Sequence, residues 1–282
     1  MDGQDLLAHE QAIASLDTTP ARPDPVVRTI TFSDITDAIG AGLRDFQRAP
    51  VYGLTFGILY CLGGIMTVLS ASALNMPYLS YPIAAGFALV GPLVAIGLYE
   101  VSRLIERGEP LGWSRIIGTV LRQSGKEIGW MSFVVLFVLM MWMYQVRLLL
   151  ALFLADETMG TMREFLQVVL TTPQGWTFLA VGHVIGAVLS LLMFSLTVVS
   201  FPILLDRNVD FITAMITSVR AVMKNPTPMI VWAGIIVATL ICASVPFFVG
   251  LIIVLPVLGH TSWHLYRKLV APEAEAAGSP AA

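Results

Sequence analysis

Two histidines near the C-terminal end of the chain have the spacing that most readily supports chemistry. His260 and His264 are four residues apart in an apolar segment, so on a helix both imidazole rings lie on one face. Glu100 occupies the position equivalent to His264 in an internal repeat. Two imidazole nitrogens and a carboxylate form a donor set that suits zinc and related ions. The alternative is that these side chains make hydrogen bonds and lie at the membrane–water interface.

A third histidine, His183, lies in another apolar segment between Gly182 and Gly186, whose spacing is typical of closely packed membrane helices. We therefore interpret His183 as a hydrogen-bonded packing residue. Gly53 and Gly57 form a second glycine pair of the same kind. The sequence contains no phosphate-binding loop, dinucleotide loop, nucleophile elbow or metalloprotease helix. The sequence therefore predicts a protein that is not an enzyme and that uses no cofactor.

These residues belong to a chain with the composition of an integral membrane protein. Hydrophobic residues make up 56% of it and charged residues 12%, against about 45–50% and about 25% in soluble proteins. A membrane-spanning helix needs about 20 apolar residues. Six apolar segments are predicted as spans, at residues 51–71, 78–102, 128–154, 176–205, 228–245 and 246–266. Cys61 and Cys242 lie inside these segments and indicate no disulfide, and the net charge of −3 indicates no nucleic-acid partner.

Basic residues are concentrated in alternate loops between the apolar segments. Five of them lie between the second and third segments, whereas residues 72–77 and 244–246 carry no charge. Because basic loops stay in the cytoplasm, six spans place both termini there. Residues 1–30 and 271–282 are rich in acidic residues, proline and small residues, and we predict disordered cytoplasmic arms there. Residues 31–270 form the predicted membrane domain.

The chain also contains an internal repeat. Residues 33–50 align with residues 209–226, and a weaker middle copy ends near residue 126. Each copy is an amphipathic helix that precedes two spans, so the predicted fold is all-α and built from three tandem units. Amphipathic helices with basic residues lie on anionic membrane surfaces. The predicted lipid anchors, which would lie at the membrane interface or against lipid, are Arg44, Arg48, Arg122, Lys126, Arg220, Lys224, Trp263, Tyr266 and Arg267. The alternative is a collar that senses lipid or docks a partner.

Three segments at the ends of spans carry a family resemblance. They are Gly91-Pro92-Leu93 with Gly97-Leu98-Tyr99-Glu100 and Ser102-Arg103; Pro202 to Arg207; and Pro256 to His260 with Trp263-His264 and Tyr266-Arg267. With them, residues 35–270 resemble the DUF2189 family of uncharacterised proteobacterial integral membrane proteins. The resemblance implies no established activity, although some members carry a cytochrome c oxidase label. A haem–copper core needs more membrane histidines than His183, His260 and His264 provide.

With this resemblance, the sequence favours a non-enzymatic protein of the bacterial inner membrane with an accessory or scaffolding role. Such a protein packs against lipid or other membrane proteins, and a respiratory complex is one candidate partner. A second hypothesis is a transporter or channel for a small or lipid-like substrate. Its polar lining would come from Thr55, Thr67, Ser190, Ser195 and Thr197. A third is a redox component that binds metal or haem through the two histidines and the glutamate of the candidate metal site.

Overall fold

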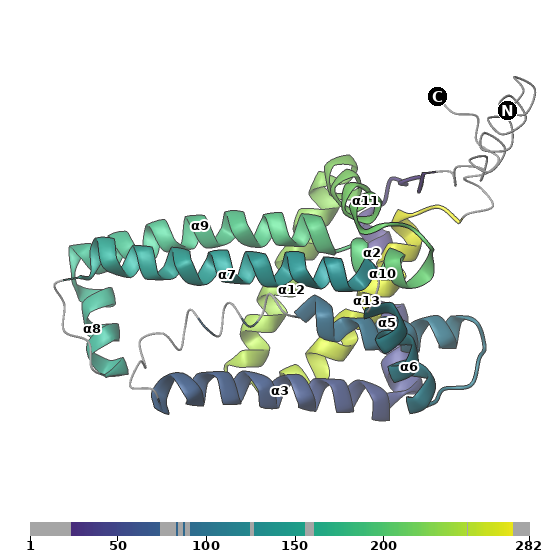
Figure 1. The fold of residues 1–282 in the computed structure, drawn as a ribbon, viewed down its shortest axis with the longest axis horizontal. Coiled ribbons are helices and arrows are strands. Elements are labelled where there is room, and N and C mark those ends of the chain that lie inside the picture. Colours follow the sequence, from purple (N-terminus) through teal and green to yellow (C-terminus); the bar gives the residue numbers. More distant parts are fainter. Residues whose placement is uncertain are drawn as a thin grey trace, which may run out of the picture.

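The computed structural model describes residues 24–73, 83, 87, 91–124, 127–155, 161–246 and 248–272, which are mainly helical (Figure 1). The predicted all-α class is therefore confirmed. The predicted arm and tail fall mostly outside the described residues, as does Lys126. The described helices are α2 (Phe32–Arg48), α3 (Pro50–Ala73), α5 (Gly91–Glu106), α6 (Trp113–Ser124), α7 (Glu127–Phe153), α8 (Met162–Thr171), α9 (Pro173–Thr197), α10 (Ser200–Asp206), α11 (Phe211–Lys224), α12 (Pro226–Ser244) and α13 (Leu251–Leu269).

Four stretches of the described residues are long and apolar enough to cross a bilayer. They are Pro50–Thr67, Glu127–Phe153, Pro173–Asp206 and Pro226–Ser244. The predicted second span is described mainly through α5, because most of residues 78–90 lie outside the described part. The predicted sixth span corresponds to α13, whose first half is apolar and whose second half carries histidines and basic residues.

Proline and short polar side chains mark the helix starts. Pro50, Pro173 and Pro226 are the first residues of α3, α9 and α12. The backbone N–H of a first residue has no acceptor within its helix, so proline costs no hydrogen bond there. Thr31 and Asp34 form a capping box at the start of α2, and the Thr31 N–H donates to the Asp34 carboxylate at 2.8 Å. These local signals explain why helix starts agree closely with the sequence pattern.

The short amphipathic helices α2, α6 and α11 each come directly before a long apolar helix, α3, α7 and α12. Each buries one side in the protein. The buried residues include Ile35 and Ala38 of α2, Ile116 of α6, and Ala214 and Ala221 of α11. The sequence predicted that these apolar sides lie on lipid. The structure instead turns part of each side toward neighbouring helices, because small residues allow close approach.

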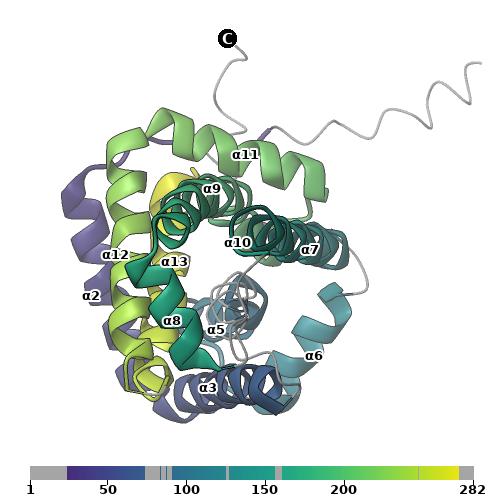
Figure 2. The same cartoon turned by 90° about the vertical axis from the view of Figure 1, so that its left-hand side faces the viewer.

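Helix α13 lies at the centre of the packing. It contacts α2, α3 and α5 extensively, and it also contacts α10 and α12. Gly42 of α2 packs directly on Thr261, where an added Cβ would be 2.6 Å from the Thr261 backbone nitrogen. Figure 2 looks along the long helices and shows α5 near the middle of a ring that includes α3, α6, α7, α9 and α12. The C-terminal ends of α5, α10 and α13 meet at one end of the protein.

The hairpin between α12 and α13 turns later than predicted. The sequence places the turn at residues 244–246, whereas the described turn residues continue to Gly250 and α13 begins at Leu251. Phe248 has a φ of 65°, a conformation that a bulky side chain rarely adopts. The extra turn residues move the start of the sixth helical segment toward the C-terminus.

The two ends of the described chain lie side by side. Val27 forms an antiparallel bridge with Val270. Asn225, between α11 and α12, accepts a hydrogen bond from the Ile30 N–H at 2.8 Å and so holds the same segment. The arm predicted over residues 1–30 is therefore too long, because its last residues are paired with the segment that follows α13.

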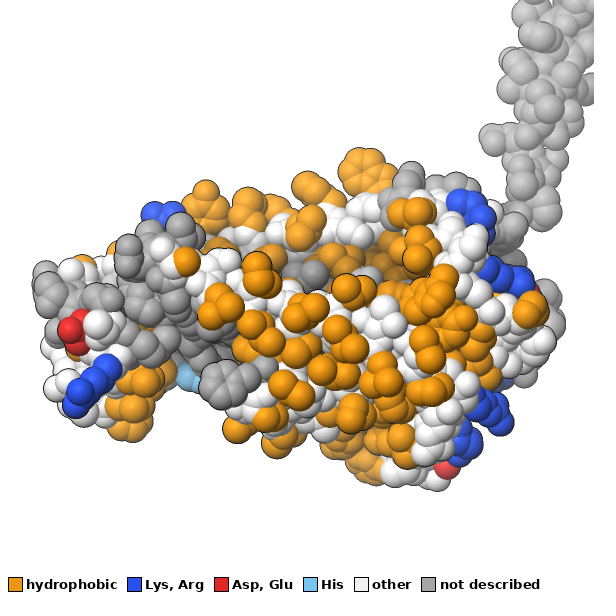
Figure 3. Space-filling model, turned by 90° about the horizontal axis from the view of Figure 1, so that it is seen from below, with side chains coloured by type: hydrophobic (Ala, Val, Ile, Leu, Met, Phe, Trp, Pro, Cys, Tyr) orange, Lys and Arg blue, Asp and Glu red, His pale blue; other side chains and the backbone are white. Residues whose placement is uncertain are grey.

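The outer surface of the long helices is strongly apolar. Large exposed side chains include Leu59, Leu62 and Met66 on α3 and Phe133 and Phe137 on α7. Figure 3 shows hydrophobic side chains across the long middle of one face, with Lys and Arg side chains gathered toward its two ends. A soluble protein rarely exposes an apolar surface of this extent, and the distribution matches a lipid-facing band.

Candidate functional site

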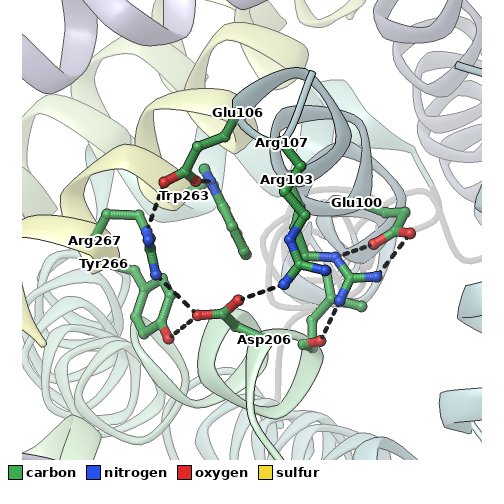
Figure 4. A network of polar contacts seen from close by, with 9 residues as sticks. Glu100, Arg103, Glu106, Arg107, Asp206, Trp263, Tyr266 and Arg267 are labelled. Atoms are coloured by element: carbon green, nitrogen blue, oxygen red, sulfur yellow. Dashed lines mark hydrogen bonds and ion pairs between the residues drawn. The ribbon is translucent and has the colours of Figure 1, made fainter. Parts of the chain in front are cut away.

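The sequence motifs at the ends of α5, α10 and α13 meet in one polar network (Figure 4). Each helix contributes at least one charged side chain near its C-terminal end. Membrane helices rarely contain charged side chains, and those that do usually pair them. The network therefore identifies the place where the distinctive residues of this chain act together.

Glu100 and Arg103 form the most buried pair of the network. The Arg103 Nε and Nη2 donate to the two carboxylate oxygens of Glu100 at 2.7 and 2.9 Å. The Glu100 side chain is only 1% exposed. Arg103 Nη1 also donates to the Leu205 carbonyl oxygen at 3.2 Å. The pair thus has the two-point geometry that gives strong charge-assisted hydrogen bonds, and it links α5 to α10.

Asp206 at the end of α10 connects the other two helices. Its Oδ2 accepts hydrogen bonds from the Tyr266 hydroxyl at 2.8 Å and from Arg267 Nη1 at 3.1 Å, both on α13. Its Oδ1 lies 3.5 Å from Arg107 Nη2, just beyond the end of α5. In Figure 4, Asp206 lies between these groups. One carboxylate therefore joins the ends of three helices.

Glu106 connects α5 directly to α13. Its two carboxylate oxygens accept hydrogen bonds from the Trp263 indole N–H and from Arg267 Nε, each at 3.0 Å. Trp263 and Tyr266 are fully buried. The prediction that these two aromatic residues anchor the protein in lipid is therefore wrong. Their polar atoms bond to carboxylates inside the protein, although residues of this type at a span end are typical of an interfacial belt.

A second polar group joins α2, α5 and α13. His264 Nε2 donates to Asp45 Oδ2 at 2.7 Å, and His260 Nδ1 lies 2.7 Å from the Ser102 hydroxyl. Burial raises the pKa of Asp45, but hydrogen bonds from His264 and Ser102 outweigh that effect, so the pKa lies below its usual value. The His260 Nε2 atom is buried and has no hydrogen-bond partner among the described residues.

The predicted metal ligands do not form one cluster. Glu100 is bonded to an arginine, His264 to an aspartate, and His260 to a serine. Within the part of the chain that the structure describes, no group of three or more His, Cys, Asp or Glu side chains could hold a metal ion. The hydrogen bonding that the sequence left as part of the alternative describes the contacts of these residues better.

The basic residues of the amphipathic helices lie on the surface wherever the structure describes them. These exposed residues are Arg44, Arg48, Arg122, Arg220 and Lys224. Lys224 donates to the Val27 carbonyl oxygen at 2.8 Å, and Arg220 lies 3.7 Å from Asp24. Two of the predicted lipid anchors therefore also hold the N-terminal segment.

Helix α2 is held on α13 by charge as well as by packing. Lys268 Nζ donates to Asp34 Oδ1 at 2.8 Å and to Asp37 Oδ2 at 3.1 Å. The hydrogen bond from Lys268, together with the backbone N–H of Thr31, lowers the pKa of Asp34 to about 2. The first predicted amphipathic helix is thus fixed to α13.

The glycine pairs lie at two helix contacts. Gly53 and Gly57 face α13 from α3, and a Cβ at Gly57 would be 2.8 Å from the backbone carbonyl carbon of Ile252. Gly182 and Gly186 lie on the side of α9 toward α7, where a Cβ would be 3.6 and 3.2 Å from the nearest atom of a side chain. The first contact is therefore much tighter than the second.

Sequence reasoning missed Asp45 and Glu106, and it included Asp206 only within a family-like segment, without a role for its carboxylate. Asp45, Glu106 and Asp206 lie at the borders of apolar segments, where the sequence suggests ordinary loop charges. A carboxylate next to buried apolar residues and near a basic span end is the signal that could have found them. Their arginine, tyrosine and histidine partners lie on helices far away in the sequence.

The fold and the networks define a helical integral membrane protein in which distant charged residues hold the helices together. The family model DUF2189, described as a predicted integral membrane protein, matches residues 80–206. This match confirms the family resemblance, and the matched segment contains Glu100, Arg103 and Asp206. Searches among curated proteins and among solved structures gave no match.

Proposed function

We propose that this chain is a non-enzymatic protein of the bacterial inner membrane with an accessory or scaffolding role. The observation that carries this proposal is the pairing of its chemistry-bearing side chains. Glu100, Asp206 and His264 each bond to a side chain of the protein itself. Groups held in this way stabilise contacts between helices rather than face a substrate. The outer apolar faces then supply the surfaces for lipid or for other membrane proteins.

The helices α7 and α12 have the most surface available for a partner. Only 22% of the α7 segment and 17% of the α12 segment are buried inside the protein, against 50% of Pro173–Asp206. On α7, Phe133 and Phe137 are exposed one helical turn apart. Large aromatic side chains of this kind contribute strongly where protein surfaces meet. Other membrane proteins, with a respiratory complex as one candidate, are the proposed partners.

The proposal includes six spans in three tandem units, with both termini in the cytoplasm. Each of α2, α6 and α11 leads directly into a long apolar helix, which supports the three units. The bridge between Val27 and Val270 supports placing the two ends on one side of the membrane. The basic residues near the ends of α5 and α13 support the cytoplasmic side.

A tag at Met1 and a tag at Ala282 are each expected to resist external protease in intact spheroplasts, because both ends lie in the cytoplasm. Both tags should become sensitive when the membrane is opened with detergent. Cleavage of either tag in intact spheroplasts would contradict the six-span topology. A periplasmic and a cytoplasmic marker protein in the same cells control for membrane integrity.

The accessory role predicts that the full chain co-purifies from native membranes in mild detergent with a membrane protein in fixed stoichiometry. A double variant, Phe133→Ala with Phe137→Ala, should weaken that association because it removes the aromatic surface of α7. The matched control is Leu62→Ala with Met66→Ala, which shortens two exposed side chains with the same spacing on α3. Purification of the chain with lipid alone, or equal loss in both double variants, would exclude the proposed α7 contact.

A further inference from the structure

An open polar cleft lies at the end of the protein where α5, α10 and α13 meet. It has a volume of about 230 Å³ and is lined by Arg107, Asp206, Arg207, Arg267 and Pro272. The lining thus contains three guanidinium groups and one carboxylate. The Asp206 carboxylate already accepts hydrogen bonds from Tyr266 and Arg267, and its second oxygen lies near Arg107. Glu106, outside the lining, also pairs with Arg267 at 3.0 Å. Two of the three guanidinium groups thus have a carboxylate partner, and the cleft keeps one further positive charge.

Arg207 carries the positive charge that remains in the cleft. Arg207 is only 9% exposed, and its guanidinium group donates a hydrogen bond to the Ala271 carbonyl oxygen. Among the residues that the structure describes, no carboxylate forms an ion pair with it. A buried charge without an opposite charge is costly, so the arrangement favours an anion from outside the chain.

We propose that this cleft binds one phosphate group. The planar guanidinium group matches phosphate oxygens with two parallel hydrogen bonds, and several arginines together define a phosphate site better than lysines do. The Arg107 and Arg267 side chains of this cleft are partly exposed. Arg207 is more buried and supplies the cation that has no carboxylate partner among the described residues.

The phosphate could come from a lipid headgroup or from a free phosphorylated solute. Basic pockets between membrane helices on the cytoplasmic side commonly bind anionic headgroups. The lipid source rests on the proposed topology, which puts this end of the bundle at the cytoplasmic surface. The free source does not depend on that topology, so the two arms of one experiment can separate them.

The test uses the full chain in nanodiscs and measures its unfolding temperature. One arm replaces a zwitterionic lipid stepwise by phosphatidylglycerol. The other arm keeps the zwitterionic lipid and adds inorganic phosphate, with chloride at equal ionic strength as the reference. We expect stabilisation in at least one arm, and we expect Arg107→Gln to weaken the apparent affinity roughly tenfold, since one charged hydrogen bond is lost.

Arg115→Gln is the matched control. The Arg115 side chain is 45% exposed and that of Arg107 is 47% exposed, and each contacts one carboxylate, but Arg115 lies outside the cleft. Arg107→Lys, which keeps the charge, should retain more of the response than Arg107→Gln. A response to phosphate identifies a free anion, and a response to phosphatidylglycerol alone identifies a headgroup.

The proposal is overturned if neither arm stabilises the protein. It is also overturned if Arg107→Gln is stabilised by phosphate or phosphatidylglycerol to the same extent as the unmodified chain and the Arg115→Gln control. These outcomes are independent of the co-purification experiment, because that experiment concerns the exposed apolar surfaces of α7 and α3, whose residues do not line the cleft.

Discussion

An Arg103→Met variant is expected to lose about 3–5 kcal/mol of free energy of unfolding. Removing the guanidinium leaves the Glu100 carboxylate without its two charge-assisted hydrogen bonds, at a position only 1% exposed. The variant also loses the bond to the Leu205 carbonyl oxygen that links α5 to α10. The cost is large because a buried charge cannot recover hydration when its partner is removed.

The purified chain is unfolded at equilibrium in mixed micelles that contain a rising fraction of sodium dodecyl sulfate. Circular dichroism detects the unfolding. A Glu100→Met and Arg103→Met double variant should recover much of the loss, because it removes both charges together. Arg44→Met, on the exposed side of α2, should change stability by no more than about 0.5 kcal/mol. Equal stability of the Arg103 and Arg44 variants would show that the buried pair contributes little.

The long helices could be predicted from the sequence because their signals are local. Apolar length placed the first span at 51–71, and α3 runs from Pro50 to Ala73. The third span, predicted at 128–154, corresponds to α7 at Glu127–Phe153. Apolar length does not describe the second half of α13, because its polar side chains are buried against other helices.

The networks could be predicted only in part, because they join residues far apart in the sequence. The family-like segments pointed to Glu100, Arg103 and Tyr266 as distinctive residues. Their partners, such as Asp206 for Tyr266, follow from how α5, α10 and α13 pack, and no local pattern encodes that packing. The same limit explains the error over aromatic anchoring, since a tyrosine at a span end can face either lipid or protein.

The two networks also explain why α13 is less apolar than the other long helices. Its second half replaces lipid contact with bonds to α2, α5 and α10, through His264, Trp263 and Tyr266 respectively. Its first half packs through close backbone approach instead. The helix thus changes from apolar packing to polar pairing along its length, and α3 lies against the apolar half.

A Gly57→Ala variant is expected to lose about 1–3 kcal/mol of stability, although alanine is the better helix former. The added Cβ would lie 2.8 Å from the carbonyl carbon and the Cα of Ile252. Because these atoms belong to the backbone of α13, no side-chain rotation relieves the overlap, and α3 must move away. Membrane helices associate mainly through close packing, so the separation costs contact along the whole interface.

Gly234→Ala provides the matched control, since a Cβ at this position of α12 meets no atom within 4 Å. The same substitution in an apolar helix should there leave stability unchanged or raise it slightly. Unfolding in mixed micelles measures both variants under the conditions used for Arg103. If Gly57→Ala unfolds at the same denaturant fraction as Gly234→Ala, then α3 and α13 do not depend on backbone contact at this glycine. A selective loss at Gly57 would instead establish that the apolar half of α13 is held by the shape of its neighbour, as its polar half is held by charge.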